Sequence, residues 1–248
     1  MCTVTIVPTG ARDAGAFRMA CSRDELHGRA PAQPPQTRTI DNQRVLMPID
    51  PASNGTWVGV NQSGLALTLL NYNPTDPPIG RDRSRGTVIP LLLNARTVGD
   101  VVALASEVER ERMMPFRLVA CDGETLLLWR STESIEQAEA GPWSRSPVMF
   151  TSSGLGDHMV EGPRRELFDT WFAVDATTYT DRQLAYHQHR WLGREHLSVA
   201  MHRDDARTVS YTTVTVDADR IAMIYHPDRP DRDAQDVTAT LQRRLARQ

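Results

Sequence analysis

The sequence contains no lysine, because all 28 basic residues among its 248 are arginine. This absence excludes a lysine nucleophile, a lysine Schiff base and the lysine of a phosphate-binding loop. Basic runs are short and the formal net charge is −3, which argues against nucleic-acid binding by phosphate neutralisation. No stretch approaches the roughly 18 apolar residues that cross a membrane, and no secretory-signal pattern is present. We therefore expect a cytoplasmic protein with neither a nucleic-acid nor a membrane partner.

Cysteine is also scarce. The chain has three cysteines, at positions 2, 21 and 121, and their odd number and unpaired spacing argue against a disulfide framework. Cys21 and Cys121 end apolar, strand-like runs, so we predict that they are small buried side chains. No His-Glu-x-x-His, Cys-x-x-Cys or carboxylate-rich pattern occurs. We therefore predict neither a catalytic metal nor another cofactor.

A cysteine directly follows the initiator methionine. A small second residue is the context in which Met1 is normally removed, and removal would leave Cys2 with a thiol and a free α-amine on one carbon. An α-amine titrates near about pH 8 and a thiol near about 8.5. Such a cysteine carries a nucleophile beside a nearly matched proton acceptor. The alternative is that a small residue simply begins an N-terminal strand.

The hydrophobic periodicity predicts hairpins at both ends of the chain and helices in the middle. Strands are predicted at residues 2–7, 16–21, 56–60, 65–71, 116–121, 125–129, 148–152, 209–216 and 220–225. Helices are predicted at residues 87–93, 99–112, 163–174, 180–189 and, in a charged tail after about 227, at 236–247. Residues 30–55 contain five prolines and are predicted to form a surface loop. The pattern indicates one α+β domain over residues 1–248, with antiparallel sheets and helices outside them.

Several short blocks in order resemble the NRDE family, whose animal members include transport and Golgi organisation proteins. The blocks are Met1-Cys2, Ser22-Arg23-Asp24-Glu25, Gly55-Thr56-Trp57-Val58-Gly59-Val60-Asn61, Leu70-Asn71-Tyr72, Ser84-Arg85-Gly86, Thr151-Ser152-Ser153-Gly154-Leu155 and Ala206-Arg207-Thr208-Val209-Ser210. That family is similar to N-terminal nucleophile hydrolases of the bile salt hydrolase and penicillin V acylase type. The resemblance implies a four-layer αββα sandwich whose first strand presents its terminal residue at one end of the packed sheets.

The resemblance also implies roles for individual residues. Cys2 would be the nucleophile, and Asn71 at the end of a strand would donate a hydrogen bond to the oxyanion. Arg23 would lower the pKa of the thiol, and a carboxylate would hold the amine. Adjacent residues of a strand point to opposite faces, so either Asp24 or Glu25 is the carboxylate that holds the amine. If Asp24 holds the amine, Glu25 would bind the substrate.

The chain departs from the family pattern at two places. Ser22 replaces the asparagine of the motif that names the family and so lacks an amide that both donates and accepts. Ser152 and Ser153 stand where the hydrolase relatives have an asparagine. Because only hydroxyls occupy that block, we expect it to bind substrate.

Arg207 has two interpretations. It matches a late arginine that the relatives place beside the nucleophile. Alternatively, it pairs at the surface with Asp204 or Asp205, which is the commoner fate of an exposed arginine.

The sequence predicts a hydrolase that cleaves a small, non-peptide amide through a thioester on Cys2. The alternative is a binding or trafficking protein, for haem or another small molecule, that keeps the fold without turnover. A purely structural subunit is a third interpretation. The identity of the substrate and the oligomeric state are not encoded in any readable motif.

Overall fold

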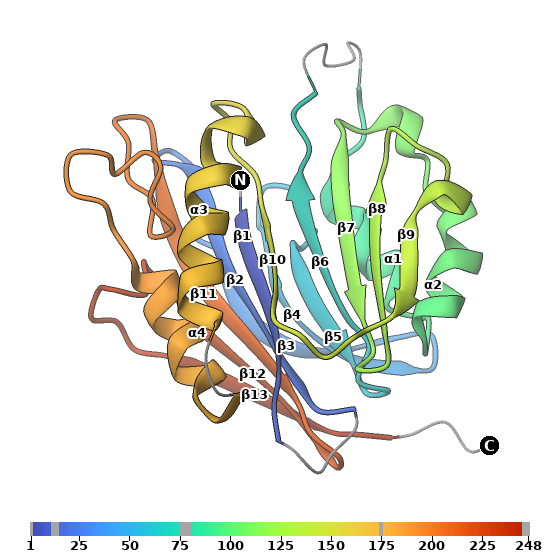
Figure 1. The fold of residues 1–248 in the computed structure, drawn as a ribbon. Coiled ribbons are helices and arrows are strands. Elements are labelled where there is room, and N and C mark those ends of the chain that lie inside the picture. Colours follow the sequence, from blue (N-terminus) through green and yellow to red (C-terminus); the bar gives the residue numbers. More distant parts are fainter. Residues whose placement is uncertain (1, 11–14, 75–80, 174–175, 245–248) are drawn as a thin grey trace.

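Two antiparallel sheets pack face to face and carry helices on their outer surfaces (Figure 1). The computed structural model describes residues 2–10, 15–74, 81–173 and 176–244. The strands of the first sheet are, in spatial order, β10 (Val148–Thr151), β1 (Cys2–Pro8), β2 (Phe17–Leu26), β11 (Ala206–Val216), β12 (Arg220–His226) and β13 (Val237–Gln242). Those of the second are β3 (Gln33–Ile40), β4 (Gln43–Ile49), β5 (Val58–Asn61), β6 (Ala66–Asn71), β7 (Phe116–Cys121), β8 (Thr125–Arg130) and β9 (Glu139–Pro142).

The helices form the two outer layers. The second sheet is covered by α1 (Val88–Leu92) and α2 (Val98–Leu104), and the first by α3 (Asp157–Phe172) and α4 (Tyr179–Gln188). Short 3₁₀ helices lie at Arg85–Thr87, Ala105–Glu107, Arg110–Arg112, Ile135–Gln137 and Ala176–Thr178. The prediction of an α+β, four-layer αββα sandwich is therefore confirmed.

Strand β1 is buried on both faces, because it lies inside the first sheet and between two layers. Cys2, Val4 and Ile6 face the core between the two sheets, whereas Val7 packs beneath α3 and α4. Side chains alternate along a strand, so this pattern directs the Cys2 side chain into the gap between the sheets. Figure 1 places the N-terminal end of β1 where the sheets separate.

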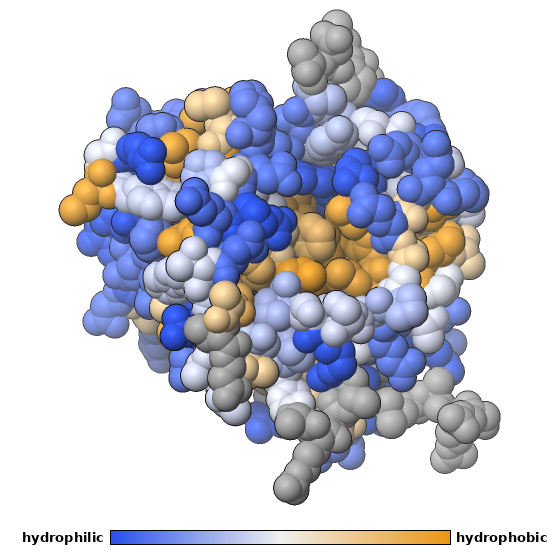
Figure 2. Space-filling model, viewed as in Figure 1, coloured by the Kyte–Doolittle hydropathy of each residue, from blue (hydrophilic) through white to orange (hydrophobic). Residues whose placement is uncertain are grey.

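The core between the sheets reaches solvent at the edge formed by β9 and β10. A groove of about 380 Å³ there is lined by apolar side chains that include Leu126, Leu128, Val148 and Phe150. Figure 2 shows the apolar surface that runs between the two halves of the molecule. These four side chains pack against the central core, so the groove is a continuation of it.

Two predictions about local structure are wrong. Residues 30–55 contain the hairpin of β3 and β4, not a loop alone. Pro34 and Pro35 are tolerated because β3 is an edge strand, where a missing N–H need not break a ladder. The predicted helix at 236–247 is strand β13, whose apolar residues Ala239 and Leu241 recur at the period of a strand and pack on the core. Residues 245–248 lie outside the described part.

The helix boundaries also differ from the prediction. The helix predicted at 99–112 ends at Leu104 and continues only as 3₁₀ turns. The helix predicted to begin at Pro163 begins at Asp157, whose carboxylate accepts a hydrogen bond from the Ser153 N–H before the first turn (2.8 Å). Residues 174 and 175 are not described. Within the described ranges, no helix has the length and apolar character that a bilayer span requires.

Candidate active site

Cys2 lines a cavity of about 110 Å³ at the end of the sandwich. The cavity wall comes from β1 and β2 of the first sheet, from the ends of β4 and β6 and the starts of β5 and β7 in the second, and from the segment 84–86. Cys2 pairs with Arg23 across β1 and β2, so the two side chains share the inner face. The Cys2 side chain is therefore presented to a small space with a cation beside it.

The surroundings of Cys2 lower the pKa of its thiol below the ordinary value. The largest cause is a hydrogen bond donated by the Cys21 thiol, and the Arg23 guanidinium acts in the same direction. Burial and the Asp24 carboxylate oppose them. The pKa of Cys21 is raised well above its usual value for the complementary reason, so Cys21 stays a thiol and a donor. The arrangement favours ionisation of Cys2 in particular.

The backbone nitrogen of Cys2 is held by the loop that follows β10. It donates a hydrogen bond to the Ser152 hydroxyl (3.2 Å), and the Ser152 N–H donates to the Cys2 carbonyl (2.9 Å). Met1 lies outside the described residues. Removal of Met1 would make this nitrogen the α-amine, and Ser152 would then bond the amine. Ser152 is not among the residues that line the cavity.

Arg23 is fixed by three neighbours. Its guanidinium donates to Asp50 (2.6 Å) and to Glu25 (3.1 Å), and its central carbon lies 4.3 Å from the centre of the Trp57 ring. Only about 4 % of Arg23 is exposed. Both carboxylates bond the same terminal nitrogen. A guanidinium that is held at this nitrogen and on one face keeps its charge in one place beside Cys2.

The two candidate carboxylates lie on opposite sides of β2. Glu25 lines the cavity, whereas Asp24 is buried on the outer face, where it accepts a hydrogen bond from the Thr208 hydroxyl (2.6 Å). Burial raises the pKa of Asp24, and the nearby charge of Arg164 opposes this shift. Because the charge of Asp24 acts on Cys2 through the sheet, Asp24 is placed to affect the Cys2 thiol without facing the cavity.

The remaining predicted residues divide into two groups. Asn71 ends β6 and lines the cavity, and its side chain makes no hydrogen bond to any residue that the structure describes. Ser153 is buried, and its hydroxyl accepts from the Leu155 N–H (3.2 Å). Arg207 pairs with Asp228 at the surface and does not line the cavity. The structure thus gathers Cys2, Arg23, Glu25 and Asn71 around one cavity, with Asp24 and Ser152 behind it, and places Ser153 and Arg207 elsewhere.

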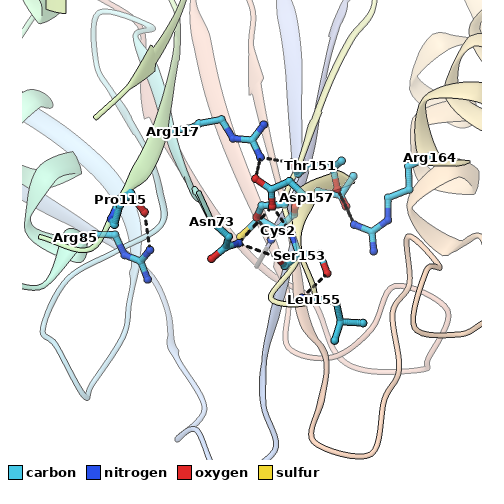
Figure 3. A network of polar contacts seen from close by, with 12 residues as sticks. Cys2, Asn73, Arg85, Pro115, Arg117, Thr151, Ser153, Leu155, Asp157 and Arg164 are labelled. Atoms are coloured by element: carbon cyan, nitrogen blue, oxygen red, sulfur yellow. Dashed lines mark hydrogen bonds and ion pairs between the residues drawn. The ribbon is translucent and has the colours of Figure 1, made fainter. Parts of the chain in front are cut away.

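A polar network beside Cys2 was not predicted from the sequence (Figure 3). Arg117 of β7 donates to the Thr151 carbonyl (2.6 Å) and to Asp157 (2.7 Å). The Asn73 amide donates to the Ser153 carbonyl (2.8 Å). These contacts tie the second sheet to the loop that holds the Cys2 nitrogen. Arg117 lies in an apolar strand with no motif around it, so the sequence offers no signal for this role.

A second unpredicted polar layer supports β1 from its outer side. Arg164 of α3 donates to the hydroxyls of Thr3 (2.8 Å) and Thr151 (2.7 Å). His187 of α4 bonds the Thr5 hydroxyl (2.9 Å) and the Ser22 hydroxyl (2.7 Å). Ser22, the position that departs from the family motif, therefore faces the helices and not the cavity.

Burial of His187 makes stability depend on pH. Its pKa is lowered to about 3, first by burial and then by the charges of Arg18 and Arg164. In the unfolded chain a histidine binds a proton near about pH 6.5. The stabilisation is therefore complete above that pH and is lost progressively as the pH falls towards 3, by about 2 kcal/mol between pH 6.5 and pH 5.

We expect His187→Asn to remove this dependence. Denaturant unfolding at pH 7 and pH 5 measures it, and the difference in stability between wild type and variant is expected to shrink by about 2 kcal/mol at the lower pH. Parallel stability curves for the two proteins would contradict a neutral, buried His187.

Within the described residues, no three His, Cys, Asp or Glu side chains group closely enough to hold a metal ion.

Three comparisons with known proteins bear on this chain. The sequence model of the Transport and Golgi organisation 2 family matches residues 1–203. No curated protein matches the chain.

Solved structures with a similar chain path include two of a bile acid hydrolase and one of an acid amidase. Two are a mutant and a variant of conjugated bile acid hydrolase from Clostridium perfringens, each with 12 % identity and a TM-score of 0.49. The first covers 100 % of this chain and 99 % of its own, and the second 99 % of both. The third is a Caenorhabditis elegans orthologue of N-acylethanolamine-hydrolyzing acid amidase, with 11 % identity, a TM-score of 0.49, and coverage of 85 % of this chain and 91 % of its own.

Proposed function

The chain belongs to the Transport and Golgi organisation 2 family, and from this premise and the geometry at Cys2 we propose that it is an N-terminal-cysteine hydrolase. The substrate would be a small, non-peptide amide, and the intermediate a thioester on Cys2. The observation that carries the proposal is the position of one residue. The Cys2 thiol, with its lowered pKa, faces the cavity, while its backbone nitrogen lies against Ser152.

The first half of the reaction forms the thioester. After Met1 is removed, the α-amine of Cys2 takes the proton from the thiol, and the sulfur attacks the amide carbonyl. The carbonyl oxygen becomes an oxyanion, and Asn71 is the amide donor in the cavity that can bind it. When the intermediate collapses, the carbon–nitrogen bond breaks and the α-ammonium returns its proton to the departing amine.

The second half cleaves the thioester with water. The α-amine now takes a proton from the attacking water, and the same donor binds the second oxyanion. Collapse of this intermediate breaks the carbon–sulfur bond, releases the carboxylic acid and restores Cys2. Ser152 would orient the amine through both steps, and Arg23 would favour the thiolate form of the leaving sulfur.

The alternative of a haem carrier gains no support at this site. A cavity of about 110 Å³ is much smaller than a haem macrocycle, so Cys2 could not serve as an axial ligand without rearrangement of its walls. Binding of a smaller molecule without turnover is the outcome that the experiment below distinguishes.

Mass spectrometry of the intact protein together with a panel of small amides tests the proposal. We expect loss of Met1, an acyl adduct on Cys2 during turnover, and release of both the acid and the amine. Retention of Met1 would remove the base on which the proposal depends. A processed protein that binds panel members without forming the adduct would instead identify a binding protein.

A further inference from the structure

The charged groups around the cavity form a network that is neutral within itself. Arg23 bonds both Glu25 and Asp50, and Arg29 bonds Asp50 through two of its nitrogens (2.6 and 3.1 Å). Two guanidinium groups and two carboxylates thus alternate along one wall. Each of these charges is already matched by protein.

Arg85 lies outside this network. It lines the same cavity as Cys2, and its guanidinium donates one hydrogen bond, to the Pro115 carbonyl (2.9 Å). It forms no ion pair with any other residue in the described ranges. Burial lowers the pKa of Arg85, and the charges of Cys2 and Glu25 oppose this shift without cancelling it. Arg85 is half-buried, and its remaining donors bond no described residue, so they are open to water or to a ligand.

The backbone on either side of Arg85 is fixed. The Gly86 N–H donates to the Ser84 hydroxyl (3.2 Å), and the Gly86 carbonyl accepts from the Thr56 N–H (3.0 Å). Gly55 packs so closely on Gly86 that a Cβ at Gly55 would lie 2.5 Å from the Gly86 carbonyl group. The segment is therefore held against the second sheet, and the Arg85 guanidinium is presented to the cavity from a rigid base.

We propose that Arg85 binds a carboxylate of the substrate, so that the amide cleaved at Cys2 is anionic. This inference rests on the proposed function for the reaction, but the anion site itself does not require turnover. Guanidinium presents a planar pair of donors that matches a carboxylate. Because the cavity also has to hold the reacting carbonyl, the carboxylate lies within a few bonds of the amide.

Alkylation of Cys2 by two reagents of nearly equal size tests this site without any hydrolysis. In each case the sulfur bonds to the methylene carbon and iodide leaves, but iodoacetate carries a carboxylate and iodoacetamide is neutral. The ratio of the two rates at Cys2, followed by peptide mass spectrometry, is divided by the same ratio for glutathione in the same buffer. We expect this quotient to favour iodoacetate by about tenfold or more in the wild type, the size of a charge-assisted hydrogen bond.

Three variants separate a specific site from a general charge effect. Arg85→Gln is expected to abolish the preference, and Arg85→Lys to restore part of it. Arg29→Gln removes the same charge from the same cavity wall, but from a guanidinium that Asp50 already pairs, and is expected to change the quotient less than about threefold. Far-ultraviolet circular dichroism of each variant establishes that it is folded.

Two results of the alkylation experiment would overturn the inference. Equal losses in Arg85→Gln and Arg29→Gln would show a general effect of charge, and equal slowing of both reagents in Arg85→Gln would show that Arg85 only stabilises the thiolate. A preserved iodoacetate preference in a protein that hydrolyses no amide would overturn the proposed reaction and leave the anion site standing. If the protein hydrolyses neutral amides and Arg85→Gln leaves that rate unchanged, the anion site would be overturned and the proposed reaction would stand.

Discussion

Replacing Cys2 by alanine is expected to lower the rate of the proposed amide hydrolysis by about 10⁴- to 10⁶-fold, as in enzymes that lose their nucleophile. The physical reason is that no other described cysteine can substitute. Cys21 and Cys121 are fully buried, and burial raises the pKa of Cys121 to about 12. The measurement is the release of amine from the most active member of the amide panel, with the free energy of unfolding determined in parallel.

Two further proteins separate the thiol of Cys2 from its amine. Insertion of one alanine between Met1 and Cys2 keeps the thiol but moves the free amine to another residue. We expect this protein to lose hydrolysis nearly as completely as Cys2→Ala, while iodoacetamide still alkylates Cys2. Cys21→Ala is the matched control, because it removes a thiol from the same core and costs Cys2 one hydrogen bond. Its expected loss is at most about tenfold.

The result that would contradict the role of the amine is hydrolysis by the protein with the inserted alanine at the wild-type rate. Cys2 would then act with a different base, and Glu25 and Asp50 are the carboxylates among the residues that line the same cavity. Activity in Cys2→Ala at more than about one hundredth of the wild-type rate would contradict the role of the thiol.

The layered fold was predictable where the sequence pattern is local. The hairpins at 116–130 and 206–226 combine apolar strands with short polar turns, and their strands lie where the periodicity places them. The hairpin at 33–49 was not predicted, because its prolines are typical of a loop. Proline argues against a strand only where neighbouring strands pair with both of its edges. Whether β3 has a neighbour on its outer side is decided by the order of the sheet, and residues 33–40 do not encode that order by themselves.

Only those parts of the site that depend on side-chain alternation along one strand, or on pairing within one hairpin, were predictable from the sequence. Arg23 faces the thiol because it is in register with Cys2, and Asp24 faces away because side chains alternate. The Ser152 contact to the Cys2 nitrogen joins positions 150 residues apart, and its direction depends on how β10 pairs with β1. Arg85 stood in a recognised block, but its significance lies in the absence of a carboxylate partner among the described residues, which no sequence pattern reports.

The second large effect is expected at Asn71. Asn71→Ala should lower kcat by about 10²- to 10³-fold, the cost of removing one oxyanion donor, and should change KM little. The amide is suited to this role because it lines the cavity and is not engaged by any side chain or backbone group in the described ranges. Steady-state kinetics measure both constants, and the rate of Cys2 alkylation by iodoacetamide checks that the thiol is unaffected.

Asn73→Ala is the control for this prediction, since it removes the same amide two residues further along the chain. The Asn73 amide is already bonded to the Ser153 carbonyl and to Asp157, so it supports the loop after β10 and is not available to an oxyanion. We expect its loss to lower stability and to reduce kcat by less than about tenfold. If both variants lost kcat equally, or if Asn71→Ala kept kcat within about threefold of the wild type, the oxyanion donor would have to be a backbone N–H or another side chain of the cavity wall. Trp57 is then the next candidate, because it lines the cavity and its indole N–H is buried without a hydrogen-bond partner in the described structure.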